Sequence, residues 1–320
     1  MTLGAHVRTL GRGPGRSRSL SREEAVDAMQ LMLSGEADPH AIGALLMLMR
    51  MKGETADEIA GFAQAAQQSL PALPRPALDW PSYAAGRTRG LPWFLLSARL
   101  VADAGHPVLM HGWNGADAAV RTGLAAAGIP VAEGPTEAST LMEQHGIAYL
   151  PLEQLSPALF RLLRLRDVLH LRSCVNTVCR MLNPARASVS VQGVFHPPYR
   201  LLQADAGAIL GLDALTVIKG GGGEFERHPA KAIAAFGLRA GAAWETSFPA
   251  LLPEATRRLD DGESDPALLG ALWAGERDDP FAEAVVLGTA ALALDTLGQN
   301  APLESARQLW QARRAVTASA

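Results

Sequence analysis

The sequence predicts a mixed α/β (or α+β) protein, in which a small N-terminal helical domain precedes a larger domain with a central sheet flanked by helices. Capping boxes at 21–24 and 55–58, each followed by a helical apolar pattern, predict the helical domain. Beyond residue 90, helical patterns alternate with short β-branched runs, which is typical of a sheet covered by helices. A chain of 320 residues has room for both domains.

The N-terminal domain is expected to contain three helices with short connections, as in a small bundle. These helices span about 21–33, 39–50 and 55–69. Gly35 and Gly53 follow the first two, since glycine readily adopts the left-handed conformation that ends a helix. Residues 1–19 contain a Gly-Arg-Gly-Pro-Gly run and are predicted to form a loop.

The remainder of the chain is predicted to begin with a proline-rich linker at 71–81. The expected helices are 92–104, 116–127, 201–210 and 281–297, and the expected strands are 107–110, 129–131, 148–151, 187–195 and 215–218. We place the helical domain at 1–72, with hinge helices at about 155–183 that return to it. The α/β domain is then 73–320.

Composition excludes several classes of protein. No apolar run approaches the roughly 20 residues of a membrane helix, and no apolar stretch follows the N-terminal arginines as in a secretory signal. The two cysteines, Cys174 and Cys179, lie in one segment and indicate neither a disulfide framework nor a zinc site. We therefore expect a reduced, cytoplasmic protein with no membrane contact.

Arginine is unevenly distributed, although the net charge is only −3. The first 22 residues contain arginines but no acid, and 161–186 contains arginines and a single Asp. The arginines of these two segments are Arg8, Arg12, Arg16, Arg18 and Arg22, and then Arg161, Arg164, Arg166, Arg172, Arg180 and Arg186. They form either ordinary solvated surfaces or a binding surface for phosphate groups.

The segment 169–198 carries the most informative pattern. Arg172 and Asn176 are four residues apart and are expected to share one helix face, and Asn183-Pro184 should end that helix. The segment resembles the anthranilate phosphoribosyltransferase family (glycosyltransferase family 3, with a nucleoside phosphorylase-like fold). In that family an Arg-x-x-x-Asn helix leads into Asn-Pro and then Gly-Val-x-His-Pro. The resemblance implies that Arg172 and Asn176 bind the acceptor; the alternatives are an Arg172 ion pair at the hinge and a capping role for Asn176.

The block 20–65 resembles the N-terminal helical domain of the same family, which implies a homodimer formed through this domain.

In the α/β domain the resemblance is weaker at the donor site. Transfer from phosphoribosyl pyrophosphate (PRPP) needs a glycine-rich loop, hydroxyl groups and carboxylates that hold Mg²⁺. The family's Gly-Thr-Gly-Gly-Asp loop falls on 81–90, where a tyrosine and two arginines replace the clustered glycines.

The resemblance still supplies candidates for donor or anion binding, which are Ser82, Arg87, Arg89, His111, Gly112 and Asn114. Arg87 and Arg89 can bind phosphate in bidentate fashion. His111 and Arg172 are the catalytic candidates, and the alternative for His111 is a turn histidine bonded to backbone. Asn114 is alternatively a cap or turn residue.

The family's Asp-Glu pair for magnesium falls on Phe225-Glu226, with Glu224 at a shifted position. Glu224 and Glu226 are therefore the remaining metal candidates. No cofactor is expected, and Mg²⁺ is expected only if the protein is a transferase.

The Pro-Ser-Tyr start of the donor segment and His196-Pro197-Pro198-Tyr199 resemble a divergent YbiB-type branch of the family, whose members bind nucleic acid without sequence preference. The leading hypothesis is therefore a protein with a degenerate PRPP/Mg site that binds nucleic acid or another polyanion. The expected contacts are Arg8, Arg12, Arg16, Arg18, Arg161, Arg164 and Arg166. The alternatives are an active phosphoribosyltransferase or glycosyltransferase on an aromatic or similar acceptor, and a small-molecule sensor with an acceptor pocket around Arg172.

Overall fold

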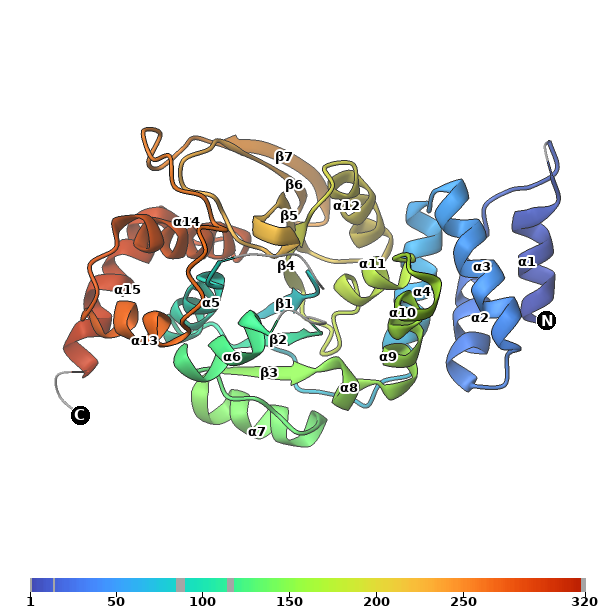
Figure 1. The fold of residues 1–320 in the computed structure, drawn as a ribbon, viewed down its shortest axis with the longest axis horizontal. Helices are drawn as coiled ribbons and strands as arrows, with labels where there is room; N and C mark the ends of the chain where they lie inside the picture. The colour runs from blue at the N-terminus through green and yellow to red at the C-terminus, as the bar shows by residue number, and fades with distance from the viewer. Residues whose placement is uncertain (1, 14, 85–89, 114–117, 318–320) are drawn as a thin grey trace.

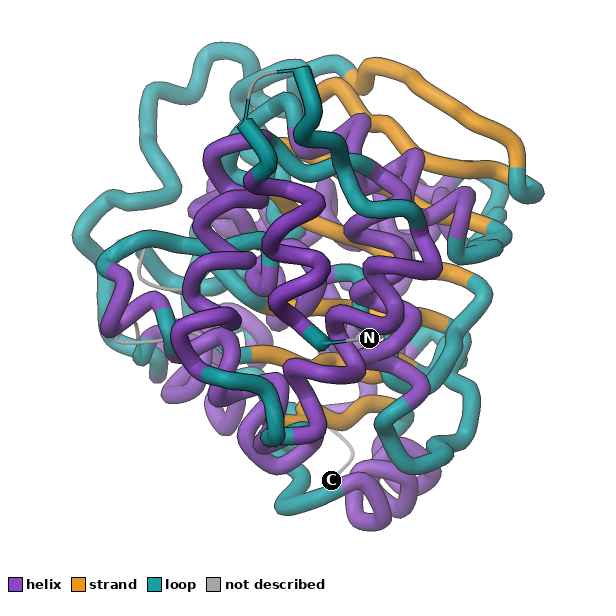
Figure 2. The backbone as a smooth tube through the Cα atoms, turned by 90° about the vertical axis from the view of Figure 1, so that its right-hand side faces the viewer, coloured by secondary structure: helices purple, strands orange, loops and turns teal. Residues whose placement is uncertain are grey.

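The computed structural model describes residues 2–13, 15–84, 90–113 and 118–317. Four helices form one end of the molecule, a sheet occupies the centre, and three C-terminal helices lie at the opposite end (Figure 1). Viewed from the helical end, the bundle stands in front of the strands (Figure 2). The predicted fold class, a helical domain followed by a mixed α/β domain, is confirmed.

The helical domain follows the local signals closely. Its helices are α1 (Leu3–Gly11), α2 (Arg22–Ser34), α3 (Pro39–Lys52) and α4 (Ala56–Gln68). Both expected capping boxes are formed, at Ser21 and Thr55, each with a glutamate three residues later. Gly35 adopts φ 81°, a conformation that favours glycine, so α2 ends there.

The loop predicted for residues 1–19 is wrong over its first half, because α1 is a helix. Leu3, His6 and Leu10 recur on one face of α1 and are all buried, and α1 packs on α3. The ring of His6 also bonds to Asp27 of α2 at 2.6 Å. No side-chain cap begins α1, so tertiary packing rather than a local signal stabilises this helix.

Four short helices follow β3 (Ile147–Pro151) in the chain. They are α8 (Leu152–Leu155), α9 (Pro157–Arg164), α10 (Arg166–Leu169) and α11 (Val175–Arg180). Two of them, α9 and α11, pack on the bundle. One apolar core includes Leu45 and Ile59 of the bundle together with Leu159 and Val175 of these helices. The middle segment therefore joins the two domains by burying apolar surface against α2 and α4.

The sheet has seven strands in the order β3-β2-β1-β4-β5-β6-β7. The strands are β1 (Leu78–Ser82), β2 (Val108–Gly112), β3 (Ile147–Pro151), β4 (Val189–Val194), β5 (Ala214–Lys219), β6 (Ile233–Arg239) and β7 (Ala242–Phe248). The first five are parallel, and β6 and β7 continue the sheet in antiparallel pairing. The chain progresses outward from β1 to β3 and then crosses to β4 on the other side of β1. This change of direction creates a switch point, where open α/β sheets bind ligands beyond the carboxyl ends of the strands.

Helices cover both faces of this sheet. They are α5 (Phe94–Asp103), α6 (Ala119–Ala126), α7 (Pro135–His145), α12 (Tyr199–Ile209), α13 (Ala267–Ala274), α14 (Pro280–Thr296) and α15 (Pro302–Thr317). A second apolar core surrounds Trp80 and Phe225, whose rings meet edge to face at 5.4 Å between centroids. Helix α12 packs on β5, β6 and α4, so it touches both the sheet and the bundle.

Several expected elements differ from the structure. The linker predicted at 71–81 ends earlier, because β1 begins at Leu78. Proline is tolerated at Pro81 since β1 pairs with β4 only at Asp79, so the two strands already diverge there. The strand expected at 129–131 is reduced to an isolated bridge at Val131. Strands β6 and β7 and helices α7, α13 and α15 were not predicted. Over the described ranges, no helix combines the length and apolar character needed to cross a membrane.

Candidate functional site

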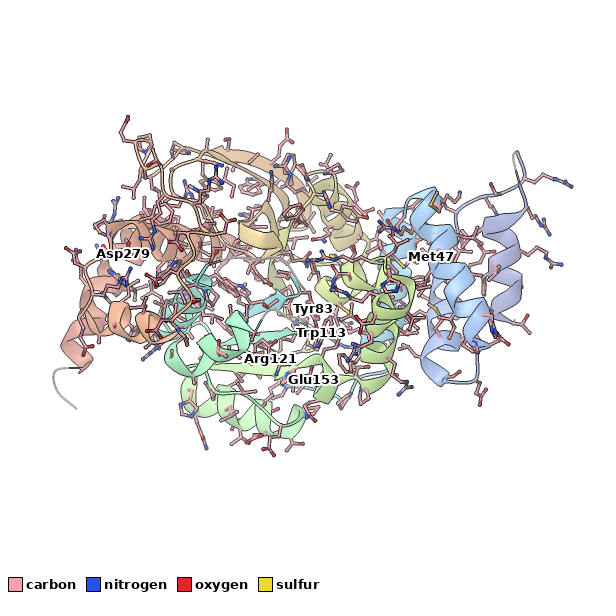
Figure 3. All side chains as sticks on the ribbon, in the orientation of Figure 1. Met47, Tyr83, Trp113, Arg121, Glu153 and Asp279 are labelled. Atoms are coloured by element: carbon pink, nitrogen blue, oxygen red, sulfur yellow. The ribbon has the colours of Figure 1, made fainter. Side chains whose placement is uncertain are left out.

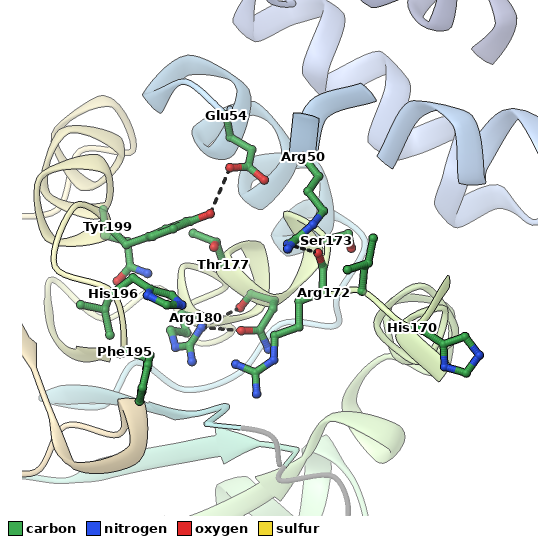
Figure 4. Close-up of a pocket in the computed structure, with 14 residues that line it drawn as sticks. Arg50, Glu54, His170, Arg172, Ser173, Thr177, Arg180, Phe195, His196 and Tyr199 are labelled. Carbon is green, nitrogen blue, oxygen red and sulfur yellow. Dashed lines mark hydrogen bonds between the residues drawn. The ribbon is translucent and has the colours of Figure 1, made fainter. Parts of the chain in front are cut away.

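A pocket of about 240 Å³ lies where the helical domain meets the switch point of the sheet. We call it the hinge pocket. Its lining comes from α3 (Arg50), the α3–α4 connection (Glu54), α11 (Asn176, Arg180) and α12 (Tyr199, Gln203), together with the segment before α11 and the end of β4. Figure 4 shows Glu54, Arg180 and Tyr199 converging from separate elements.

Arg180 is the most deeply placed cation of this pocket. Its side chain is 7% exposed, and its guanidinium donates to Asn176 Oδ1 at 2.6 Å and to the Tyr83 carbonyl at 2.9 Å. In the part of the chain that the structure describes, no carboxylate forms an ion pair with Arg180. Burial accordingly lowers the pKa of Arg180, because the charged form loses hydration. Arg180 was predicted only as one of the basic residues of 161–186, not as a site residue. Its position one helical turn after Asn176 was the available signal.

Arg172 and Asn176 do not share a helix face as predicted, because α11 begins only at Val175. Arg172 precedes the helix, donates to the Ala84 carbonyl at 3.2 Å, and its own carbonyl accepts from Arg50 at 2.6 Å. It therefore connects the end of β1 with the helical domain.

Asn176, by contrast, is in α11 and is almost fully buried. Its amide nitrogen contacts the Tyr83 carbonyl at 3.4 Å, and its oxygen accepts from Arg180. Tyr83 lies in the centre of the molecule (Figure 3). Asn176 is thus not a helix cap; it orients Arg180 in the pocket.

The side of the pocket nearest α4 contains a hydrogen-bonded acid. Tyr199 donates its hydroxyl to Glu54 at 3.3 Å. Burial raises the pKa of Tyr199 to about 12 and also raises the pKa of Glu54. Gln203, one turn further along α12, is fully buried, and neither its Nε2 nor its Oε1 has a partner within the described residues. Nothing in the sequence pattern pointed to Gln203.

Ser82, His111 and Gly112, the candidate donor residues that the structure describes, lie at the carboxyl ends of β1 and β2. Ser82 and Gly112 are adjacent in the parallel pairing of these strands, and both are buried. A Cβ on Gly112 would lie 2.1 Å from the Ser82 carbonyl oxygen, so glycine is required by this close approach. Arg87, Arg89 and Asn114 lie outside the described residues.

His111 is in strand β2 and is fully buried, so it is not the backbone-bonded turn histidine considered above. Its Nδ1 lies 2.9 Å from the Tyr83 hydroxyl, and its Nε2 lies 3.1 Å from Asp79 Oδ1. Ser190 of β4 donates to the other oxygen of Asp79 at 2.7 Å. These bonds cross three adjacent strands and rigidify the sheet at its switch point.

Glu224 and Glu226 flank the donor segment. Glu224 Oε1 accepts from the Ala84 backbone N–H at 2.8 Å, and Glu226 Oε2 accepts from the Phe94 N–H at 2.9 Å. Both side chains are at most 1% exposed. The two carboxylates therefore hold the backbone of Ala84 and of Phe94. Across the described ranges, no group of three or more His, Cys, Asp or Glu side chains has an arrangement that could hold a metal ion.

The arginines expected to contact nucleic acid differ in their partners. Arg8, Arg12 and Arg16 are exposed, and none has an acidic partner among the described residues. Arg18 is also exposed, but its guanidinium forms a bidentate pair with Glu24 at 2.5 and 2.7 Å.

The arginines of the second basic segment, 161–186, also differ in whether they have a partner. Arg161 of α9 is exposed, whereas Arg164 pairs with Asp167 at 2.5 Å. Arg166 lies over the Trp113 ring, 5.8 Å from its centroid. Since α9 packs on α2, this segment is attached to the helical domain.

Comparison with known proteins assigns the chain to a family. Residues 6–70 match the helical bundle domain of a glycosyl transferase family, and residues 94–313 match its a/b domain. The chain therefore belongs to this glycosyl transferase family. Within it, the chain is similar to the anthranilate phosphoribosyltransferase of Aeromonas hydrophila, with 30% identity over 222 residues, which are 68% of this chain and 64% of that protein. It is equally similar to an uncharacterized protein of Aquifex aeolicus, with 30% identity over 217 residues and 66% of both chains.

Solved structures agree on the fold. The anthranilate phosphoribosyltransferase of Thermus thermophilus superposes with a TM-score of 0.82 at 22% identity, covering 98% of this chain and 96% of its own. The enzyme of Saccharomyces cerevisiae in complex with PRPP and Mg superposes with a TM-score of 0.78 at 15% identity, covering 98% of this chain and 95% of its own. The family inferred from the sequence motifs is confirmed, while its YbiB-type branch stays a prediction.

Proposed function

We propose that this protein binds nucleic acid without sequence preference through exposed arginines, and that it does not transfer a phosphoribosyl group from PRPP. The observation that carries the proposal is the set of exposed N-terminal arginines, Arg8, Arg12 and Arg16, without acidic partners in the described structure. Guanidinium groups free of intramolecular carboxylates are available to phosphates, and each phosphate neutralised releases counterions.

The second basic segment supports the same function. Arg161 is exposed on α9, and α9 packs on α2 of the helical domain. A homodimer formed through the helical domain, as the family resemblance implies, would present two copies of both segments along one duplex or strand. Phosphate contacts of this kind fix position but carry no base information, so the expected binding is insensitive to sequence.

The donor site argues against PRPP chemistry. A hydrated Mg²⁺ needs several oxygen ligands in near-octahedral geometry. Glu224 and Glu226 are buried, and each already accepts a backbone N–H at an end of the donor segment. These residues do not fit a Mg²⁺ site, so we assign no catalytic step to the metal.

One observation favours the alternative, an active transferase with an altered donor site. Glu224 and Glu226 are still acidic and still lie beside the segment that corresponds to the family's donor loop. Product formation that depends on both PRPP and Mg²⁺, with anthranilate or another aromatic acceptor, would establish the transferase and refute a purely binding role.

The decisive experiment is a fluorescence-anisotropy titration of labelled single- and double-stranded oligonucleotides across salt concentrations. The double variant Arg12→Glu/Arg16→Glu should weaken binding to all sequences alike and should make the salt slope shallower by about 1 per lost phosphate contact. Arg258→Glu is a matched control, because Arg258 is exposed in the α/β domain. Absence of binding at low salt, or equal losses in the double variant and the control, would refute the proposal.

A further inference from the structure

A second cavity, of about 440 Å³, lies where α12 meets the carboxyl end of β5 and the start of β6 (Figure 1). We call it the outer pocket. It shares no lining residue with the hinge pocket. Of the residues predicted for donor, acceptor or metal binding, only Glu226 lines it. Apart from this one side chain, the outer pocket is separate from the sites described above.

Lysine is concentrated at the outer pocket. The chain has only three lysines, Lys52, Lys219 and Lys231, and the last two both line this cavity. Both are exposed, and neither has an acidic partner among the described residues. Two ammonium groups at one cavity repel each other unless an anion lies between them. Their placement therefore favours an anionic ligand.

Arg200 adds a third cation, which is already held in place. Its guanidinium carbon lies 4.5 Å from the centroid of the Phe236 ring, and its Nε and Nη1 donate to the Pro197 and Ala234 carbonyls at 3.2 and 3.3 Å. Its Nη2 has no partner within the described chain. A guanidinium fixed in advance loses less entropy when it binds a ligand. Arg200 is therefore a preorganised donor whose Nη2 is free.

Arg200 and Lys219 reach the outer pocket from the same face of the sheet. Alternate residues of a strand share a face, so Lys219 follows Leu215 and Val217, which form a small core with Tyr199 of α12. Arg200 is the second residue of α12, whose N-terminus has no side-chain cap and no acidic residue in its first turn. An anion at this position would be stabilised by both the guanidinium and the helix dipole.

The outer pocket has little negative charge of its own. Among the described residues, Glu226 is the only acid that lines it, and its Oε2 already accepts from the Phe94 N–H. His228 adds no charge at neutral pH, because burial and then the charge of Lys231 lower the pKa of His228 from its usual 6.5. The three cations therefore outnumber the single carboxylate by two positive charges, which match a dianion.

We propose that the outer pocket binds a phosphate dianion, either inorganic phosphate or the terminal group of a small phosphomonoester. Arg200 donates to the phosphate oxygens through Nη2, and Lys219 and Lys231 supply the balancing charge. A phosphomonoester carries about two negative charges above neutral pH, whereas each phosphodiester of a nucleic-acid backbone carries one. The outer pocket therefore selects by charge, and it is independent of the nucleic-acid surface proposed above.

Isothermal titration calorimetry on the full chain, at about pH 8 and constant ionic strength, tests the site with inorganic phosphate, methyl phosphate and dimethyl phosphate. The first two should bind, and the singly charged dimethyl phosphate should bind at least about tenfold more weakly. The double variant Lys219→Gln/Lys231→Gln should weaken phosphate binding by about tenfold or more, because two charged contacts are lost. Since both lysines are exposed, this variant should fold like the wild type, which circular dichroism checks.

Lys52→Gln is the matched control, because it removes the third lysine of the chain, which is exposed in α3 and donates to Ser19 Oγ at 3.3 Å. It should leave phosphate affinity unchanged. The proposal is overturned if phosphate does not bind, if the double variant keeps full affinity, or if Lys52→Gln loses as much affinity as the double variant. Equal binding of dimethyl phosphate would also contradict a site for a dianion.

Discussion

The pairing of Arg18 with Glu24 leads to a specific prediction about the basic surface. Glu24 takes part in two interactions: its carboxylate accepts both ends of the Arg18 guanidinium, and it also accepts the Ser21 N–H in the capping box of α2. The Arg18 hydrogen bonds are the main reason that the pKa of Glu24 is lowered to about 2. Arg18 is therefore occupied, unlike Arg8 and Arg16.

The substitution Glu24→Gln separates these interactions, because glutamine still caps the helix but cannot form the ion pair. Since the pair lies at the surface, its loss should lower the free energy of unfolding only slightly. Arg18 then becomes available for phosphate and one negative charge disappears. The slope of log affinity against log salt should steepen by about 1.

The assay is oligonucleotide anisotropy over a salt series, with urea unfolding as the measure of stability. Arg18→Gln in the Glu24→Gln background is the control, and it should remove the gain in slope. Weaker nucleic-acid binding by Glu24→Gln, or an unchanged salt slope, would contradict the idea that pairing decides which arginines bind phosphate. The lowered pKa of Glu24 also determines how the stabilising contribution of the Arg18–Glu24 pair depends on pH. The folded pKa of Glu24 lies below its unfolded value, so the pair's contribution is present at neutral pH and is lost as pH falls from about 4.5 toward 2.

Two further predictions concern the buried contacts of the helical domain and the pocket. Leu10→Ala should lower the free energy of unfolding, measured in urea, by about 2–5 kcal/mol, because Leu10 is buried where α1 meets the bundle. The control is Leu201→Ala, because Leu201 is exposed. Equal losses of stability in the two variants would mean that α1 does not belong to the core. Glu54→Gln should change how the free energy of unfolding depends on pH. Burial raises the pKa of Glu54 in the folded protein above its usual value of 4.5. The stability of the wild type therefore falls as pH rises through that raised pKa. Thermal melting from pH 4 to 8 should show the variant gaining on the wild type with rising pH, and parallel pH profiles would contradict the assignment.

Local signals explain why the helical domain was predictable. The capping boxes at Ser21 and Thr55 and the left-handed Gly35 involve residues within one turn of each other, so the sequence reveals them directly. Helix α1 has no such cap and was missed, since it depends on packing against α3 and on the bond from His6 to Asp27. Strand β1 was mistaken for a linker, because its proline is tolerated only through the divergence of β1 from β4.

The candidate site was predictable only where the family motif covers it. Arg172 and Asn176 were identified by the motif, but not their geometry, because the helix begins after Arg172. The lack of a partner for Gln203 depends on how α12 packs between the sheet and α4, which leaves no sequence signature.

The sequence by itself determined the family, the order of helical and α/β domains, and the concentration of arginine in two segments, because motifs, caps and charge are properties of neighbouring residues. Only the tertiary structure decided which polar side chains form hydrogen bonds within the protein and which remain without a partner. Glu224 and Glu226 bond to Ala84 and Phe94, more than 130 residues away along the chain. Hydrogen bonding and burial at such separations are fixed by packing, so the hydrogen bonds of these carboxylates, the burial of Arg180 and the unpaired amide of Gln203 appear only in the folded chain.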